Sequence, residues 1–300
     1  MKGVLRIKKY KISMFDFVVV ALLMVILIVV VYPLIYVVSA SVSDPTAVSN
    51  GKMWLFPVNF TLEGYLRTIQ YKSIWVGYGN TIFYTVTGTL LALVVTLPAA
   101  YAMSRPEFYG RGALTVMVMI TMFFSGGLIP TYLNIQRLGL LDTRLLLIIN
   151  GASSAYNLIV ARTFFAGLPS SLIEAARIDG ASNTKIFSKI ILPLSKPIIA
   201  VMALYFAVPH WNEYFTPMIY IQSRDKYPLQ VFLREILIQN QLDASMALDN
   251  DVAALAEQKG RIAHLVKYSS IVISSLPLIS VYPFLQRYFI KGVMIGAVKE

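Results

Sequence analysis

The chain has 300 residues, of which 57% are hydrophobic and only 14% are charged, and its mean hydropathy is +0.67. Soluble globular domains carry about 25% charged residues, so this composition excludes an ordinary soluble domain and indicates an all-α integral membrane protein. The net charge of +11 comes from basic residues scattered along the chain, which argues against a nucleic-acid-binding surface. The absence of cysteine excludes disulfides and thiol chemistry, and two histidines are too few for a histidine metal cluster.

Apolar runs that could cross a bilayer occur about six times, since a spanning helix needs about 20 such residues. They lie at 17–38, 81–103, 113–132, 145–165, 198–221 and 265–289. The first run ends in Val38-Ser39-Ala40, which superficially resembles a signal-peptidase site. Its apolar core is longer than the about 7 to 15 residues of a signal peptide, so we expect an uncleaved first helix.

The basic residues predict how these helices are oriented, because cytoplasmic loops near the ends of spans keep an excess of Lys and Arg. If the N-terminus lies inside, the inner segments hold most of the 26 basic residues. We therefore expect both termini in the cytoplasm and a multi-pass protein of the cytoplasmic membrane. Residues 1–300 are expected to form a single transmembrane domain, because no repeat or interdomain linker is visible.

Two predicted outer connections are long. Residues 41–77 contain several Pro, Gly and Asn residues, and a short helix is expected over 62–70. Residues 222–264 carry mixed charge and an Ala-rich helical stretch at 244–261. Because loops of this length are usually functional or flexible, this extracytoplasmic loop is expected to dock a substrate-delivery protein, with a solvated lid as the alternative.

The segment 169–193 is amphipathic and predicts two short helices at the cytoplasmic surface. Pro169 and the serines after it supply a helix start, and Gly180 can adopt the positive φ that ends a helix sharply. Ser182 is the expected N-cap of the second helix, and Pro193 interrupts the pattern before the next span. The alternative is an ordinary interfacial hairpin with no partner.

The pattern in this segment resembles the EAA loop of ABC importer permeases. The matching residues are Glu174, Ala175, Ala176, Asp179, Gly180, Ala181, Ile190, Leu192 and Pro193. Residues 123–132 and the C-terminal tail extend the resemblance to the carbohydrate-uptake branch, specifically to MalG-type permeases of the polysaccharide and complex-oligosaccharide subgroup. The resemblance implies the type I ABC importer permease fold and covers nearly the whole chain.

This resemblance also implies roles and partners. In that family the EAA loop is a coupling helix seated in an ATPase subunit, and the tail lies along the ATPase dimer. The matching tail residues are Lys291, Gly292, Gly296, Ala297, Val298 and Lys299. The other implied partners are a second, non-identical permease subunit, an extracytoplasmic solute-binding protein and a sugar or oligosaccharide substrate. The chain itself is expected to be no enzyme and to hold no cofactor: it has no Walker A pattern, so ATP and Mg would bind to the partner ATPase.

The fifth apolar run contains a polar and aromatic group that is expected to line the substrate path, namely Trp211, Asn212, Glu213 and Tyr214. Ionisable groups at membrane depth normally face the protein interior or a watery cavity, and aromatic faces and amides suit sugars. The alternative is an interfacial aromatic belt with Glu213 pointing to water. Three further polar residues are expected to bond neighbouring helices: Asn150, Asn157 and Arg162.

Other functional classes fit the sequence less well. An ion-coupled secondary carrier needs buried carboxylates and preferably repeated halves, whereas the apolar segments hold little beyond Asp16 and Glu213. An intramembrane enzyme needs a convergent catalytic constellation, which His210 and His264 do not supply. An ABC importer for a solute other than a sugar stays open as an alternative.

Overall fold

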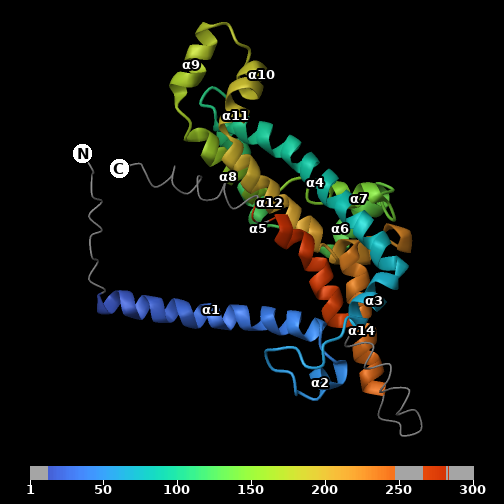
Figure 1. Ribbon diagram of the computed structural model, residues 1–300. Coiled ribbons are helices and arrows are strands. Elements are labelled where there is room, and N and C mark those ends of the chain that lie inside the picture. The colour runs from blue at the N-terminus through green and yellow to red at the C-terminus, as the bar shows by residue number, and fades with distance from the viewer. Residues whose placement is uncertain (1–12, 247–265, 282, 284–300) are drawn as a thin grey trace. The chain divides into compact units, whose positions relative to one another are not determined.

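The computed structural model describes residues 13–246, 266–281 and 283, and within these residues all regular structure is helical. The chain forms two compact units, one of Met1–Thr68 with Gln239–Val272 and one of Ile69–Ile238 with Ile273–Glu300 (Figure 1). The predicted ATPase-contacting tail lies outside the described residues, as does most of the Ala-rich stretch at 244–261.

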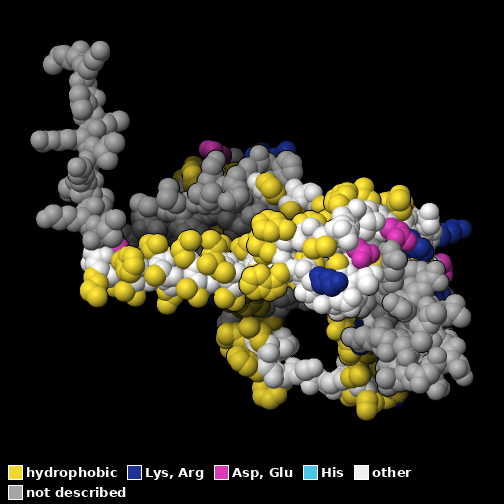
Figure 2. All heavy atoms as spheres, turned by 60° about the horizontal axis from the view of Figure 1, so that its bottom comes forward, with side chains coloured by type: hydrophobic (Ala, Val, Ile, Leu, Met, Phe, Trp, Pro, Cys, Tyr) yellow, Lys and Arg dark blue, Asp and Glu magenta, His cyan; other side chains and the backbone are white. Residues whose placement is uncertain are grey.

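The first unit begins with α1 (Met14–Ser41), which contains the predicted first span. A capping box starts this helix, because Asp16 Oδ2 accepts a hydrogen bond from the Ser13 backbone N–H at 2.9 Å. From Met14 to Val30 every side chain is exposed, and all but Asp16 are apolar. Figure 2 shows hydrophobic side chains covering the visible face of α1. A helix with an apolar surface on all sides matches what a lipid-facing span requires.

Two short helices follow α1, namely α2 (Pro45–Ser49) and α3 (Glu63–Gln70). The second of these confirms the predicted helix over 62–70. Their part of the first unit is held by a small core of Ala40, Val48 and Met53. The buried Thr68 hydroxyl also hydrogen-bonds to the Ser269 hydroxyl at 2.7 Å, which satisfies two polar groups away from water.

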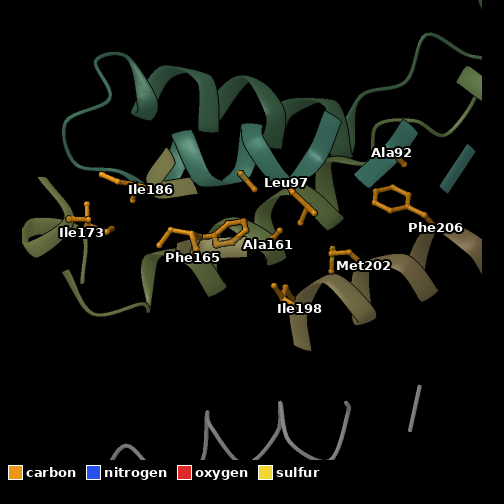
Figure 3. Packing of buried hydrophobic residues seen from close by; sticks show 12 residues of the cluster. Ala92, Leu97, Ala161, Phe165, Ile173, Ile186, Ile198, Met202 and Phe206 are labelled. Carbon is orange, nitrogen blue, oxygen red and sulfur yellow. The ribbon is translucent and has the colours of Figure 1, made fainter. Parts of the chain in front are cut away.

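The second unit is built on α4 (Lys72–Ser104), which packs against α8 (Ala155–Ala166) and α12 (Lys196–Asn212). Fully buried alanines at 92, 100 and 161 let these helices approach closely, and larger side chains such as Phe165 and Met202 fill the remaining space (Figure 3). The main core therefore lies where the three helices meet.

The prediction of one continuous helix over 113–132 is wrong. The segment consists of α5 (Arg111–Phe123) and α6 (Leu128–Arg137), which are bent by 114° relative to each other. Gly127 precedes α6 with φ 80°, a backbone conformation that L side chains rarely adopt. The Ser-Gly-Gly sequence in the middle of the apolar run therefore sets the break.

Two other predicted spans are also interrupted. Residues 145–165 contain α7 (Arg144–Ile149) and α8, and Ser154 accepts a hydrogen bond from the Asn157 N–H to cap α8. The run 198–221 divides into α12 and α13 (Phe215–Tyr220). A 3-10 turn η2 (Arg224–Lys226) and α14 (Leu229–Met246) follow.

Within the described part of the chain, α1 and α4 are each long and apolar enough to cross a membrane. Three bent pairs raise the number of candidate spans to as many as five, and the shorter apolar helix Val266–Val281 covers part of the predicted last span. The fold is thus an all-helical membrane fold with several broken helices.

Candidate functional site

The segment predicted to couple to a partner forms a helix-turn-helix hairpin, made of α9 (Ser170–Ile178) and α10 (Asn183–Ile186). Gly180 joins the two helices with φ 72°, as predicted. The Ala181 N–H donates to the Ala176 carbonyl at 2.9 Å, and the Gly180 N–H donates to the Arg177 carbonyl at 3.0 Å. This pair of bonds is a Schellman motif, which fixes the direction in which the chain leaves α9.

The second arm of the hairpin also follows the prediction at its start, because the Ser182 side chain accepts a hydrogen bond from the Lys185 N–H at 3.3 Å. The arm continues through a π-helical turn η1 (Phe187–Ile191) into α11 (Leu192–Leu194). Pro193 has no N–H and would crowd the carbonyl four residues before it in a regular α-helix, and the wider π turn relieves this crowding. Beyond Ser195 the chain bends by 83° into α12.

The two faces of the hairpin differ sharply in exposure. Ile173, Ala176, Ile186 and Ile191 are buried in the main core, so this face holds the hairpin to its own chain (Figure 3). Of the predicted coupling residues, Ala176 is thus buried, whereas five are exposed, namely Glu174, Ala175, Asp179, Gly180 and Pro193. A third group is half-buried, namely Ala181, Ile190 and Leu192. The exposed set presents two carboxylates, Glu174 and Asp179, beside small side chains.

Polar contacts anchor the hairpin to the end of α4. Arg177 forms an ion pair with Glu107, with Nη1 and Oε1 2.8 Å apart. A backbone hydrogen bond and the hydrogen bond from Arg177 hold the pKa of Glu107 below its ordinary value. Arg105 stacks over Tyr101 and donates to the Phe165 carbonyl at 2.6 Å. Tyr101, Arg105, Glu107 and Arg177 border a cavity of about 570 Å³ between the hairpin and α4.

Trp211, predicted to line the substrate path, is only 5% exposed. Its indole N–H donates to the Ser274 carbonyl at 3.1 Å, and its ring meets Tyr78 edge to face with centroids 6.2 Å apart. It also borders an apolar cavity of about 440 Å³ beside α4 and α12. These contacts give Trp211 a packing position between helices.

The three residues after Trp211 lie at the break between α12 and α13. Asn212 is exposed and donates to the Val208 carbonyl of its own helix at 3.0 Å. Glu213 Oε1 accepts the N–H groups of Phe215 and Thr216, each at 3.0 Å. Tyr214 is 43% exposed. The structure thus brings these side chains to one unwound position without burying all of them.

The polar residues expected to bond neighbouring helices do so in two cases. The Asn150 amide donates to the Thr216 hydroxyl at 3.1 Å, and Arg162 Nε donates to the Met103 carbonyl at 3.1 Å. Asn157 is buried at 6% exposure. His210, for which no role was predicted, is also buried and packs closely against Gly88.

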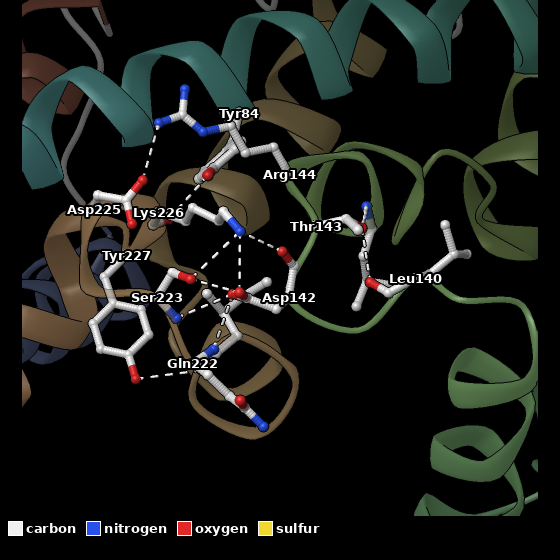
Figure 4. Close-up of polar contacts among 12 residues, drawn as sticks. Tyr84, Leu140, Asp142, Thr143, Arg144, Gln222, Ser223, Asp225, Lys226 and Tyr227 are labelled. Carbon is white, nitrogen blue, oxygen red and sulfur yellow. Dashed lines mark hydrogen bonds and ion pairs between the residues drawn. The ribbon is translucent and has the colours of Figure 1, made fainter.

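A polar cluster at the other end of α4 was not predicted (Figure 4). Asp142 accepts hydrogen bonds from the backbone N–H groups of Gln222 and Ser223 at 3.1 and 3.0 Å, and from Lys226 Nζ at 3.1 Å. The Ser223 hydroxyl and backbone hydrogen bonds hold the pKa of Asp142 well below its ordinary range. Asp142 has φ 54°, which an Asp tolerates better than most residues. Asp142 and Ser223 are 81 residues apart in the sequence, so no local sequence pattern predicts their contact.

This cluster and the hairpin lie at opposite ends of α4. Near the start of α4, Asn80 donates to the carbonyls of Asp225 and Tyr227 at 2.7 and 3.0 Å, and Tyr84 donates to the Lys226 carbonyl at 2.9 Å. Near its end, Tyr101 packs on Phe187 with ring centroids 5.1 Å apart. The second unit therefore has two structured ends joined by one long helix.

The broken apolar helices and the hairpin between them define a membrane permease subunit. The family model for binding-protein-dependent transport system inner membrane components matches residues 72–295, and the chain belongs to this family. It is therefore a multi-pass inner membrane component of a bacterial ABC importer and is not itself catalytic. Membership implies an ATPase and a binding protein as partners.

Individual relatives agree with this assignment. The chain is 38% identical over 290 residues to the polygalacturonan/rhamnogalacturonan transport system permease protein YtcP of Bacillus subtilis, covering 95% of this chain and 98% of YtcP. It is 40% identical over 271 residues to protein LplC of the same organism, covering 90% of each chain. A crystal structure of a bacterial ABC transporter involved in the import of the acidic polysaccharide alginate matches with a TM-score of 0.83 and 36% identity, covering 93% of this chain and 99% of that one.

Proposed function

We propose that this permease carries sugars or oligosaccharides into the cell. The observation that carries the proposal is the high, nearly full-length similarity to transporters whose names refer to polysaccharides. An ion-coupled carrier or an intramembrane enzyme does not fit the family. An importer for a solute other than a sugar is the remaining alternative.

The hairpin of α9 and α10 is the proposed coupling segment, docking into the partner ATPase through Glu174 and the small side chains beside it. Its geometry supports this role, because one face is anchored in the core while the carboxylate and the turn are free to contact another protein. A carboxylate that meets a basic residue of a partner forms a charge-assisted hydrogen bond. ATP and Mg bind to that ATPase, which the C-terminal tail also contacts in this proposal.

The proposed topology has about six spans and places both termini in the cytoplasm. Each span is counted from an apolar run of about 20 residues, the length that a helix needs to cross the bilayer. The hairpin then faces the cytoplasm, and the Asp142 cluster faces outward together with residues 222–264, which dock the solute-binding protein. A second, non-identical permease completes the pathway. Asn212 and Tyr214 line the path, while Trp211 and Glu213 hold the helix break in shape.

The test is reconstitution of the complex in proteoliposomes from this chain, the second permease, the ATPase and the binding protein. ATP-dependent uptake is measured for a panel of neutral and acidic oligosaccharides and for amino acids and polyamines as non-sugar solutes. Uptake of one or more oligosaccharides and no other solute is expected. Uptake restricted to a non-sugar solute would contradict the proposal, as would tight ATP binding by this chain in isolation.

A further inference from the structure

An arginine on α14 lies against the aromatic residue at the break between α12 and α13. The Arg234 guanidinium carbon lies 4.9 Å from the centroid of the Tyr214 ring. Tyr214 is 43% exposed and Arg234 is half-buried, so neither group is sealed in the core. Both belong to the second unit of the chain.

The charge of Arg234 is not neutralised within the part of the chain that the structure describes. The ion pairs among the described residues involve other basic residues, and Arg234 takes part in none of them. The neighbouring Glu235 is paired with Arg224 at 2.7 Å, and Glu213 directs Oε1 at two backbone N–H groups. A half-buried guanidinium without a carboxylate partner is ready to bind an anion.

The location fits a transport pathway. Non-helical backbone at membrane depth is tolerated only where it is covered by protein or lines a watery cavity, and broken helices often carry the substrate sites of transporters. Tyr214 follows α12, whose 17 residues place it about 25 Å along the helix from the coupling hairpin. Tyr214 directly precedes α13, and the last residue of α13 contacts the Asp142 cluster, since the Asp142 N–H donates to the Tyr220 carbonyl at 2.9 Å.

We infer that Arg234 and Tyr214 form a subsite for a carboxylated sugar residue of the transported oligosaccharide. The guanidinium lies over the ring, and its planar fork of N–H donors suits a two-point hydrogen bond to a uronate carboxylate. The exposed part of the tyrosine ring offers a face for the C–H side of the sugar. This inference rests on the proposed function and adds to it the charge of the substrate.

The experiment uses the reconstituted four-component complex and two trisaccharides of equal length, one of galacturonic acid and one of galactose. In the wild-type complex, uptake of the acidic trisaccharide is expected to exceed that of the neutral one. Arg234→Gln should lower uptake of the acidic trisaccharide by about tenfold or more, as expected for the loss of a charge-assisted hydrogen bond. Uptake of the neutral trisaccharide should change little. Arg137→Gln, at an exposed arginine of α6, is the matched control.

Four outcomes would overturn the inference. Equal losses for both trisaccharides would mean that Arg234 acts only in packing. A loss that appears in vesicles with anionic lipid and vanishes in purely zwitterionic vesicles would mean that Arg234 binds a lipid headgroup. If the wild-type complex takes up the neutral trisaccharide but not the acidic one, the inference fails and the proposed function stands. If it takes up neither, the inference fails, and the proposed function fails as well only when the wider oligosaccharide panel gives no uptake.

Discussion

Gly88 and His210 lie so close together that a methyl group at Gly88 would fall 2.2 Å from His210 Nε2. Gly88 belongs to α4 and His210 to α12, so this contact sets how near the two helices can approach in the second unit. The absence of a side chain at Gly88 on α4 thus leaves room for the His210 ring on the facing helix.

Gly88→Ala should destabilise the permease by about 1–3 kcal/mol, the usual range for overpacking a closed helix contact. Thermal unfolding of the purified complex in detergent measures the effect as a lower Tm. Gly79→Ala is the matched control, because it lies on the same helix and a Cβ there meets nothing within 4 Å. Equal Tm values for the two variants would contradict the packing argument.

Gly180→Val should abolish sugar uptake while the protein still inserts in the membrane. No atom lies within 4 Å of a Cβ at this position, so the effect comes from φ 72° alone, at about 1–2 kcal/mol for a residue forced into the left-handed region. Gly180→Asn should be tolerated better, because Asn adopts this conformation more readily. Uptake in vesicles and pull-down of the ATPase are the measurements.

The control for this experiment is Ser188→Ala, on the exposed side of the hairpin's second arm. Among the described residues, its hydroxyl donates a hydrogen bond to the Thr184 carbonyl of its own turn and to no other group. Normal uptake by the Gly180→Val complex would remove the hairpin turn from the coupling mechanism.

Trp211→Ala should lower the Tm of the complex and leave its preference among substrates largely unchanged. Removing a buried Trp commonly costs about 3–5 kcal/mol, and here the Tyr78 edge contact and the bond to Ser274 are lost together. Trp211→Phe keeps most of the packing and loses the hydrogen bond, so its Tm should lie between wild type and Trp211→Ala. If the Trp211→Ala complex has the wild-type Tm but slower uptake, the result would instead support the prediction that Trp211 contacts the substrate directly.

Asp142→Asn should lower the Tm of the complex at neutral pH, because the carboxylate accepts bonds from Gln222, Ser223 and Lys226. Asn also tolerates φ 54°, so the substitution isolates the charge. The folded pKa of Asp142 is lowered, so its stabilisation is present above the ordinary value of about 3.9 and is lost as pH falls below it.

The Tm difference between wild type and Asp142→Asn should therefore be constant from about pH 5 to 7 and shrink as pH falls below about 4. Asp225→Asn is the control, since that carboxylate is 71% exposed and lies 4.0 Å from Arg144. An undiminished difference at low pH would show that the cluster acts through shape and not through charge.

Local sequence signals predicted the local geometry well. Gly180 and Ser182 specify the hairpin turn through their own backbone and side-chain preferences, and the structure has both features as predicted. The breaks after Phe123, Ile149 and Asn212 were missed because a hydropathy window averages over them. Gly126 and Gly127 carried a signal for the first of these breaks, which the apolar neighbours outweighed.

The site beyond the hairpin could not be read from sequence for a different reason. Asp142 and Ser223, or Tyr214 and Arg234, become neighbours only when helices pack, and no local periodicity encodes which helices do so. Trp211 illustrates the same limit. An aromatic ring suits sugar binding, but the buried position of this one depends on contacts with Tyr78 and Ser274, which lie on other helices.

The length of α4 gives the second unit a mechanical property. From Asn80 to Tyr101 the helix covers about 30 Å, with residues 225–227 hydrogen-bonded near one end and the hairpin packed near the other. A tilt of about 10° pivoted at Tyr101 would carry Asn80 sideways by about 5 Å. If the hairpin is the coupling segment, a small push on it would be magnified by the length of α4 into a displacement about as wide as a sugar ring at the other end of the helix.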